Sequence, residues 1–472
     1  MSHPTQTDLP TTPIVTRTVQ VLHDFVRDAV SHLSEALNDS APEFDYNVRL
    51  ERGSDGVFRE RKKRIPTLPL LTTESLQALP NYAQCIESLR SDAVVGPHLD
   101  RLVGGTNIGS RRLGVGGILG PLIFAMSDEE GHLTFTSQKF YKRWQEFGDF
   151  FGTDRIVYKT VAPLPNLIVP AFPLRLNNEV FLDRLTEDEV TRCYQLGMIR
   201  PHFSGFHPIV YGEWAVGIRR ITFSPKLIRE GDEPLEPLDV GDEGSFGDRP
   251  LFRSDIIIDD VLSTLRLFKH TQIRAAGLVS GADPPWLTGV TQSRVLGTWP
   301  YGPGIELSEG EVPQLLELWR LLDEGGAARF GFSIRRFNLS FERGLLDDRI
   351  VDLIIAAEAL FLRDLGRSDR GELQFRVALR AAKFVEHPSY SEYEVFHIMR
   401  RAYGVRSAIV HGGSPKDTRL PDNPSANLPT FTDAVEDLVR LGLRKALSMK
   451  EDGMKMRRAE YWDSLVFSNA VR

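Results

Sequence analysis

The chain has 472 residues, of which 41% are hydrophobic and 26% are charged, proportions typical of a globular protein large enough for two or three domains. Its formal net charge of −7 argues against a protein that binds nucleic acid over a broad basic surface, so any RNA contact must be local. Its two cysteines, Cys85 and Cys193, exclude a dense disulfide framework and favour a reducing compartment.

The first 15 residues are rich in Pro and Thr and are predicted to form a disordered tail. They lack the basic segment and apolar run of a signal peptide, and no stretch of about 18 apolar residues occurs further along. We therefore expect a cytoplasmic protein with no membrane partner.

Residues 16–280 are predicted to form an α+β region. Apolar residues at helical spacing predict helices over residues 16–37 and 138–151. β-Branched and aromatic residues predict strands, and Thr186 with Glu189 forms a capping box that begins a short helix between them. The strands are expected over residues 156–161, 167–169 and 214–223. A sensor of a ligand or partner is one hypothesis for this region.

Three segments invite more specific interpretations. The basic run at residues 59–64 is predicted to be a solvated loop, with phosphate contact as the alternative. Residues 107–120, NIGSRRLGVGGILG, lack the Gly-Lys-Ser/Thr of a P-loop and the G-x-G-x-x-G order, so they are predicted to form a turn. Residues 121–126 and 132–136 are predicted to form a strand hairpin.

Residues 281–304 are rich in Pro and Gly and are predicted to be a linker. Residues 305–472 are predicted to form an all-α helical bundle, because the strand pattern disappears. Ser308 and Glu311 form a capping box, and residues 348–365 should be the central helix. Further helices are expected over residues 373–384, 391–411, 431–447 and 454–467, the last of which docks through Trp462 and Phe467.

The helix predicted over residues 391–411 carries two side chains of chemical interest. Arg406 lies on its apolar face, where a guanidinium is costly unless a carboxylate, a phosphate or a partner chain meets it. His411 follows about 140° further round the helix, beside Gly412 and Gly413.

Glu358 lies on the apolar face of the central helix. One interpretation is a buried ion pair between Glu358 and Arg406 that specifies packing. The other is that Glu358 orients Arg406 toward an open groove.

Arg406-Ser-Ala-Ile-Val-His411 is an R-x4-H pattern, and Arg336-Phe337 and DRIVDLIIAAEALFL (residues 348–362) precede it. With these motifs the last third of the chain resembles the HEPN superfamily, in its Apea-like branch. The resemblance implies a HEPN-like helical bundle that forms a homodimer. It also implies a metal-independent endoribonuclease in which the Arg and the His act, with a defence or toxin role by analogy.

RNA cleavage through the 2′-hydroxyl requires proton transfer and stabilisation of phosphate charge, and imidazole and guanidinium suit these tasks. We therefore assign His411 as general acid or base and Arg406 as phosphate clamp, with Ser407 as an auxiliary hydrogen-bond partner and Glu358 as the orienter of Arg406. No cofactor or metal is expected. His202 and His207 have no Cys or carboxylate at metal-ligand spacing.

Two alternatives remain open at this point. The bundle could be a non-catalytic RNA-binding or dimerisation module. The whole chain could instead be a ligand sensor in which the N-terminal region restrains the nuclease.

Overall fold

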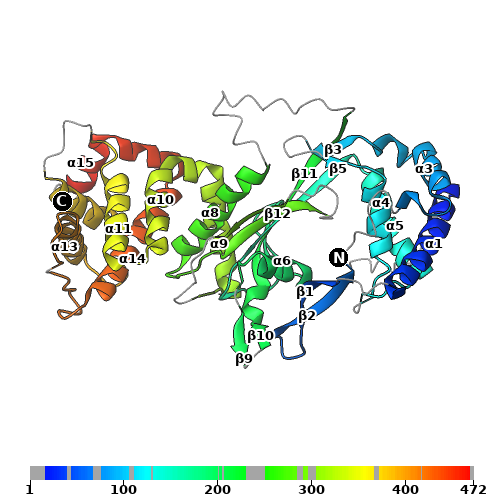
Figure 1. The fold of residues 1–472 in the computed structure, drawn as a ribbon. Helices are drawn as coiled ribbons and strands as arrows, with labels where there is room; N and C mark the ends of the chain where they lie inside the picture. Colours follow the sequence, from blue (N-terminus) through cyan, green and yellow to red (C-terminus); the bar gives the residue numbers. More distant parts are fainter. Residues whose placement is uncertain are drawn as a thin grey trace.

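The computed structural model describes residues 16–39, 44–66, 76–105, 111–128, 131–199, 201–204, 207–229, 250–283, 291–295, 304–365, 372–415 and 417–467. An N-terminal region of sheets and helices is followed by a C-terminal helical region (Figure 1), which confirms the predicted fold class at this level. Among these residues, no helix has both the length and the apolar composition needed to cross a bilayer.

The N-terminal helices pack around one apolar core. This core unites buried residues of four helices with Ile156 and Tyr158 of the sheet. Beside it, the ring of His23 contacts the rings of Phe135 and Phe140. These helices are α1 (Arg17–Asp39), α3 (Tyr82–Ser91), α4 (Gly116–Phe124) and α5 (Ser137–Gly152).

An eight-stranded antiparallel sheet forms the middle of the molecule. Its long strand β11 pairs with β5 along most of its length and with β8 and β3 at its two ends. The strands are β3 (Leu102–Gly105), β4 (Arg111–Arg112), β5 (Arg155–Pro163), β7 (Leu174–Arg175), β8 (Val180–Arg184), β11 (Val216–Arg229), β12 (Gly277–Asp283) and β13 (Thr291–Val295). The expected strands over residues 156–161 and 214–223 are therefore confirmed.

Two smaller sheets flank it. A four-stranded sheet packs on helix α6 (Glu187–Gln195), which begins at the predicted Thr186 and Glu189 capping box. Its strands, in spatial order, are β1 (Phe44–Arg52), β2 (Phe58–Pro66), β10 (His207–Val210) and β9 (His202–Ser204). A parallel pair joins β6 (Leu167–Ile168) to β14 (Ile305–Glu306).

The C-terminal helices form a bundle around α11, whose buried residues include Ile350, Leu353 and Leu360, each 0% exposed. Helices α10, α12, α13 and α14 all contact α11. The bundle consists of α9 (Val312–Leu321), α10 (Ala327–Glu342), α11 (Leu346–Phe361), α12 (Leu373–Phe384), α13 (Glu392–Val410), α14 (Leu428–Ser448) and α15 (Ala459–Phe467). The expected central position of this apolar helix is confirmed.

Helix α8 (Pro250–Phe268) lies between the sheet and the bundle and contacts β5 and β11 as well as α9, α10 and α14 (Figure 1). A single hydrophobic cluster runs from Leu182 and Ile218 of the sheet, through Leu265 of α8, to Leu443 of the bundle. The segment expected to be a linker, residues 281–304, includes strand β13, which pairs with β12. These contacts argue against a free hinge at that point.

Several local predictions differ from the structure. Residues 121–124 belong to helix α4, and only a single bridge between Ser127 and Leu133 remains of the expected hairpin. A short, wholly apolar run fits a buried helix as well as a strand, and Ile118, Leu119 and Leu122 are all fully buried. Of the turn expected over residues 107–120, residues 107–110 lie outside the described part of the chain. The remaining residues contain strand β4 and the start of helix α4.

Two further differences concern charged and aromatic residues. The basic run at residues 59–64 is part of strand β2 rather than a loop, because Phe58 is buried and β2 pairs along its full length with β1. Trp462 is 1% exposed as expected, but Phe467 is 64% exposed and does not dock on the bundle.

Candidate functional site

Helix α13 positions the residues singled out by the sequence. The predicted capping box begins it: the Ser391 backbone N–H donates to Glu394 Oε2 at 2.8 Å, and the Glu394 N–H donates to Ser391 Oγ at 3.4 Å. Val395 and Met399 bury one face in the bundle core. His411 is the C-cap, and Gly412 follows with φ 76°, a left-handed conformation that glycine adopts without strain.

Arg406 is half-buried at the edge of this face. Its guanidinium carbon lies 5.7 Å from the centre of the Tyr403 ring, and its buried Nε has no hydrogen-bond partner. Among the ion pairs of the described residues, none joins Arg406 to a carboxylate. A half-buried guanidinium outside any ion pair leaves charge available for an anion.

Tyr403 stands between Arg406 and Glu358. Burial raises the pKa of Tyr403, and the nearby Glu358 carboxylate adds to this, while Arg406 acts in the opposite direction. Glu358 is half-buried on α11, which packs against α13. The direct ion pair between Glu358 and Arg406 expected from the sequence is therefore replaced by a contact through a tyrosine.

His411 is exposed, and its backbone N–H donates to the carbonyl oxygen of Ser407 at 3.2 Å. Ser407 is half-buried one turn earlier. The His411 side chain lines a surface groove of about 750 Å³, whereas Arg406 does not. The two motif residues therefore face different sides of α13, as the helical angle predicts.

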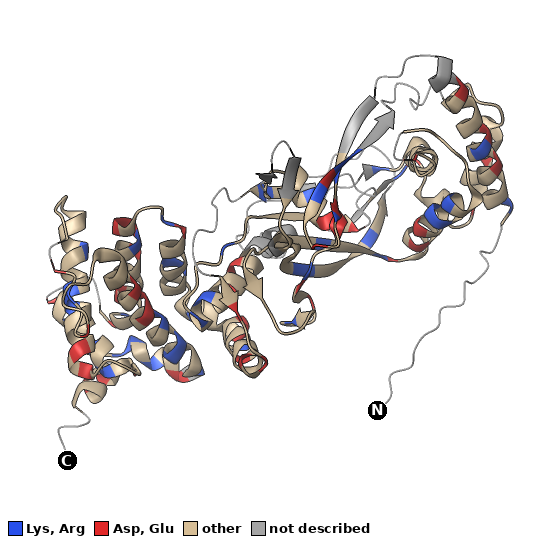
Figure 2. Cartoon of the chain, turned by 90° about the horizontal axis from the view of Figure 1, so that it is seen from below, with Lys and Arg blue, Asp and Glu red and all other residues tan. Residues whose placement is uncertain are grey.

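The groove follows one face of α13 and is bordered by α12 and by the segment after α13. It is lined by Gln374, His397, Arg400, Arg401, Gly404, Val405, Ala408, His411, Gly413, Ser414 and Asp417. Basic and acidic residues are interspersed over the described helices and strands (Figure 2), and the groove gathers the cationic side chains of Arg400 and Arg401.

The single carboxylate of the groove is shared between two guanidinium groups. Asp417 Oδ2 lies 3.5 Å from Arg401 Nε, and Asp417 Oδ1 lies 2.9 Å from Arg419 Nε. The Arg419 hydrogen bond and then Arg401 hold the pKa of Asp417 below its usual value. Positive charge therefore exceeds negative charge around the groove, because exposed Arg400 adds a further cation.

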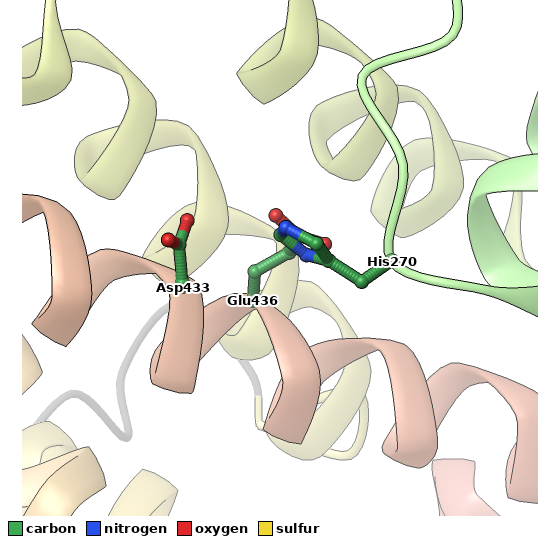
Figure 3. A group of neighbouring side chains, drawn as sticks. All are labelled: His270, Asp433 and Glu436. Atoms are coloured by element: carbon green, nitrogen blue, oxygen red, sulfur yellow. The ribbon is translucent and has the colours of Figure 1, made fainter. Parts of the chain in front are cut away.

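A second cluster of titratable groups lies where α8 meets the bundle. His270, from the connector after α8, points at Glu436 of α14, one turn after Asp433 (Figure 3). Their ligand atoms lie within 4.8 Å of one another, the spacing of a metal site. However, Arg349 of α11 pairs with Glu436 and, at 3.0 Å, with Asp433, so a guanidinium already neutralises both carboxylates. We assign the cluster a structural role.

A second cavity, of about 540 Å³, lies between α5 and the large sheet. Its carboxylates include Glu146 and Asp283, which pair with Arg143 at 2.5 Å and Lys159 at 3.0 Å. Because basic side chains already balance these groups, the cavity has less free charge than the groove on α13.

Sequence reasoning missed Tyr403 as the link to Arg406 and missed the groove residues Arg400 and Gly404. The spacing of the groove residues along α13 could have revealed the groove. On a helix, residues 393, 397, 400, 404 and 411 share one face, which becomes visible when the angles are counted from His411 rather than from Arg406. The contribution of Gln374 of α12 to the wall of the groove follows only from the tertiary structure.

Comparisons of this chain with known protein families, with curated proteins and with solved structures found no match. The residues and their geometry therefore carry the functional argument.

Proposed function

We propose that this protein is a metal-independent endoribonuclease of the HEPN type. The observation that carries the proposal is the pairing of an uncompensated, half-buried Arg406 with an exposed His411 five residues later, at the end of a single helix. The guanidinium offers a permanent charge to the phosphate, and the imidazole offers a ring nitrogen that can accept or donate a proton.

In the reaction, the 2′-hydroxyl of one nucleotide attacks the adjacent phosphorus, and the bond to the 5′-oxygen of the next nucleotide breaks. One group must accept the 2′ proton and another must donate a proton to the leaving oxygen. His411 performs one of these transfers, and Arg406 binds the phosphate oxygens as their charge grows. The products are a 2′,3′-cyclic phosphate and a 5′-hydroxyl.

Ser407 and Glu358 support this chemistry. Ser407 follows Arg406 directly and would hydrogen-bond the phosphate or the imidazole. Glu358 acts through Tyr403, whose ring lies beside the Arg406 guanidinium and whose pKa the Glu358 carboxylate raises. The arrangement restrains Arg406 without neutralising it, because no carboxylate pairs with the guanidinium in the described part of the chain.

A second copy of the chain would complete the site. Arg406 and His411 face different sides of α13, so one copy does not direct both at a single phosphate. A two-fold axis beside the end of α13 would bring His411 of each copy toward Arg406 of the other. Val410, which is 53% exposed on this helix end, provides apolar surface for such a contact.

Incubation of the purified protein with total RNA in the presence of EDTA tests the proposal. We expect cleavage by the wild type, and a loss on the order of 10²-fold or more in His411→Ala and in Arg406→Ala, the usual scale for losing a proton-transfer group or a charge-stabilising group. Terminal analysis should find 2′,3′-cyclic phosphates. Equal activity of the wild type and both variants would refute the assignment.

A further inference from the structure

The groove beside His411 is larger than the proton-transfer step requires. It extends along α13 from His397 to His411, fourteen residues apart, which is about 21 Å of helix. At one end lies the proposed catalytic imidazole, and near the other end, within about one turn of His397, lie Arg400 and Arg401. A site for a single phosphate would need neither this length nor these additional cations.

The cations in the groove differ in how well they are balanced. The Arg401 Nε lies 3.5 Å from Asp417, and its Nη1 donates to the carbonyl oxygen of Arg419 at 2.9 Å, so Arg401 is fixed in the wall. Arg400 is exposed on the neighbouring position. Within the described part of the chain its side chain has no hydrogen bond or ion pair, while its backbone carbonyl oxygen accepts a hydrogen bond from Gln374 Nε2 at 2.7 Å. This guanidinium is therefore free to take an anion from solvent.

An exposed aromatic ring lies at the entrance of the groove. Tyr393 is 72% exposed on the first turn of α13, and its ring centre lies 4.3 Å from that of His397, which lines the groove. Large exposed rings of this kind serve as stacking platforms for unpaired bases. In the same segment, Phe396 packs edge-on against the other side of His397, which holds the imidazole in place.

One of the residues that line the groove, Gly404, has no side chain. Gly404 lies mid-helix, where glycine is destabilising by about 1 kcal/mol relative to alanine. A Cβ at this position would meet nothing closer than Gln374 Nε2 at 3.6 Å, so the backbone does not require a glycine there. Its effect is to leave space above α13.

We propose that this groove binds single-stranded RNA next to the cleaved bond, with a phosphate on Arg400 and an unpaired base on Tyr393. The proposal rests on the proposed nuclease function for the identity of the ligand. It adds a binding track that runs away from His411 along one helix. The aromatic platform favours a single strand, because bases within a duplex do not expose their faces for stacking.

A non-cleavable probe tests this inference separately from catalysis. Binding of a short, fluorescently labelled 2′-O-methyl RNA is measured by anisotropy over a series of NaCl concentrations. We expect Arg400→Ala to weaken binding roughly fivefold or more, and to reduce the slope of log Kd against log salt by about 0.7, the value for one lost phosphate contact on a single strand. Tyr393→Leu should weaken binding roughly tenfold.

Two matched controls make the result specific. Arg335→Ala removes an exposed arginine of α10 outside the groove and should leave Kd unchanged. Gly404→Ala should also bind normally, whereas Gly404→Leu fills the groove and should weaken binding although the helix itself gains a better helix former.

The inference is overturned if Arg400→Ala and Gly404→Leu bind the probe as tightly as the wild type does. It is also overturned if the wild type does not bind the probe, or if a pre-annealed duplex binds as tightly as the single strand. Because the probe lacks the 2′-hydroxyl, these outcomes do not depend on activity. Binding without any cleavage of ordinary RNA would count against the nuclease proposal alone, and cleavage without groove-dependent binding would count against this inference alone.

Discussion

Two clusters of charged side chains in the bundle differ in how their charges are balanced. At the junction with α8, Glu436 is fully buried and is bound by Arg349 and by His270, whose Nδ1 lies 2.8 Å from a carboxylate oxygen. At the end of α13, Arg406 takes part in none of the ion pairs of the described residues, and the ring of Tyr403 lies beside its guanidinium.

The difference separates structural charge from charge that is available to a ligand. A buried carboxylate with two cationic partners is satisfied, and its removal mainly affects folding. A guanidinium supported by a ring and a distant carboxylate keeps its electrostatic potential for an external anion. We therefore expect the same residue types to have different roles at these two sites of one bundle.

The largest effect should follow from Arg349→Met at the junction. The substitution leaves Glu436 buried without its guanidinium, and one-sided removal of a buried ion pair typically costs about 3–5 kcal/mol of unfolding free energy. Chemical denaturation measures this loss. Activity per folded molecule should stay near that of the wild type, because Arg349 is remote from the groove residues.

Arg400→Ala is the matched control for that experiment. Its guanidinium is exposed, so its loss should change the unfolding free energy by less than about 0.5 kcal/mol. If Arg349→Met were as stable as Arg400→Ala, the distinction between the two clusters would be wrong.

A smaller effect is expected from substitutions of Tyr403, which test the site at Arg406 rather than the junction with α8. Tyr403→Phe removes the hydroxyl that interacts with Glu358 but keeps the ring beside Arg406, and Tyr403→Leu removes both. We expect kcat to fall on the order of tenfold in the first variant and further in the second, because Arg406 loses its orientation. KM should change less, since the lost interaction acts mainly on the transition state.

Glu358→Gln provides the corresponding test on α11. Glu358 is half-buried and does not pair with a guanidinium within the described residues, so its neutralisation should cost about 1 kcal/mol of stability or less. Activity should fall as in Tyr403→Phe. A variant that retained full kcat would show that Glu358 does not orient Arg406, whatever its stability.

Much of the fold could be predicted because local signals were strong. Three capping boxes predicted helix starts that the structure confirms. Helix α10 was missed, although Phe330, Ile334, Phe337 and Phe341 recur at helical spacing. The glycines before it and the charged residues among the aromatics hide the pattern. The role of α8 as a bridge between sheet and bundle depends on tertiary packing, which helical periodicity does not reveal.

The candidate site was predictable only in part. Angles along one helix predict that Arg406 and His411 diverge. They do not reveal that Tyr403 would lie between Glu358 and Arg406, because that depends on how closely α11 and α13 approach each other. The groove likewise needs Gln374 of α12 and Asp417 beyond α13, which the chain order does not connect with Arg400.

The smallest effect concerns pH and the junction cluster. The hydrogen bond to Glu436, and then the charges of Glu436 and Asp433, raise the pKa of His270 above its usual 6.5, although burial and Arg349 oppose the shift. A raised pKa in the folded state means that protonated His270 stabilises the fold. This contribution is complete below pH 6.5 and is lost as the pH rises through the folded-state value. Because the side chain is 38% exposed, solvent screening keeps the effect modest.

Unfolding free energies measured from about pH 6 to about pH 8 should therefore fall more in the wild type than in His270→Gln, which cannot titrate in this range. Parallel slopes in the wild type and His270→Gln would show that His270 does not link the connector after α8 to α14 through its charge.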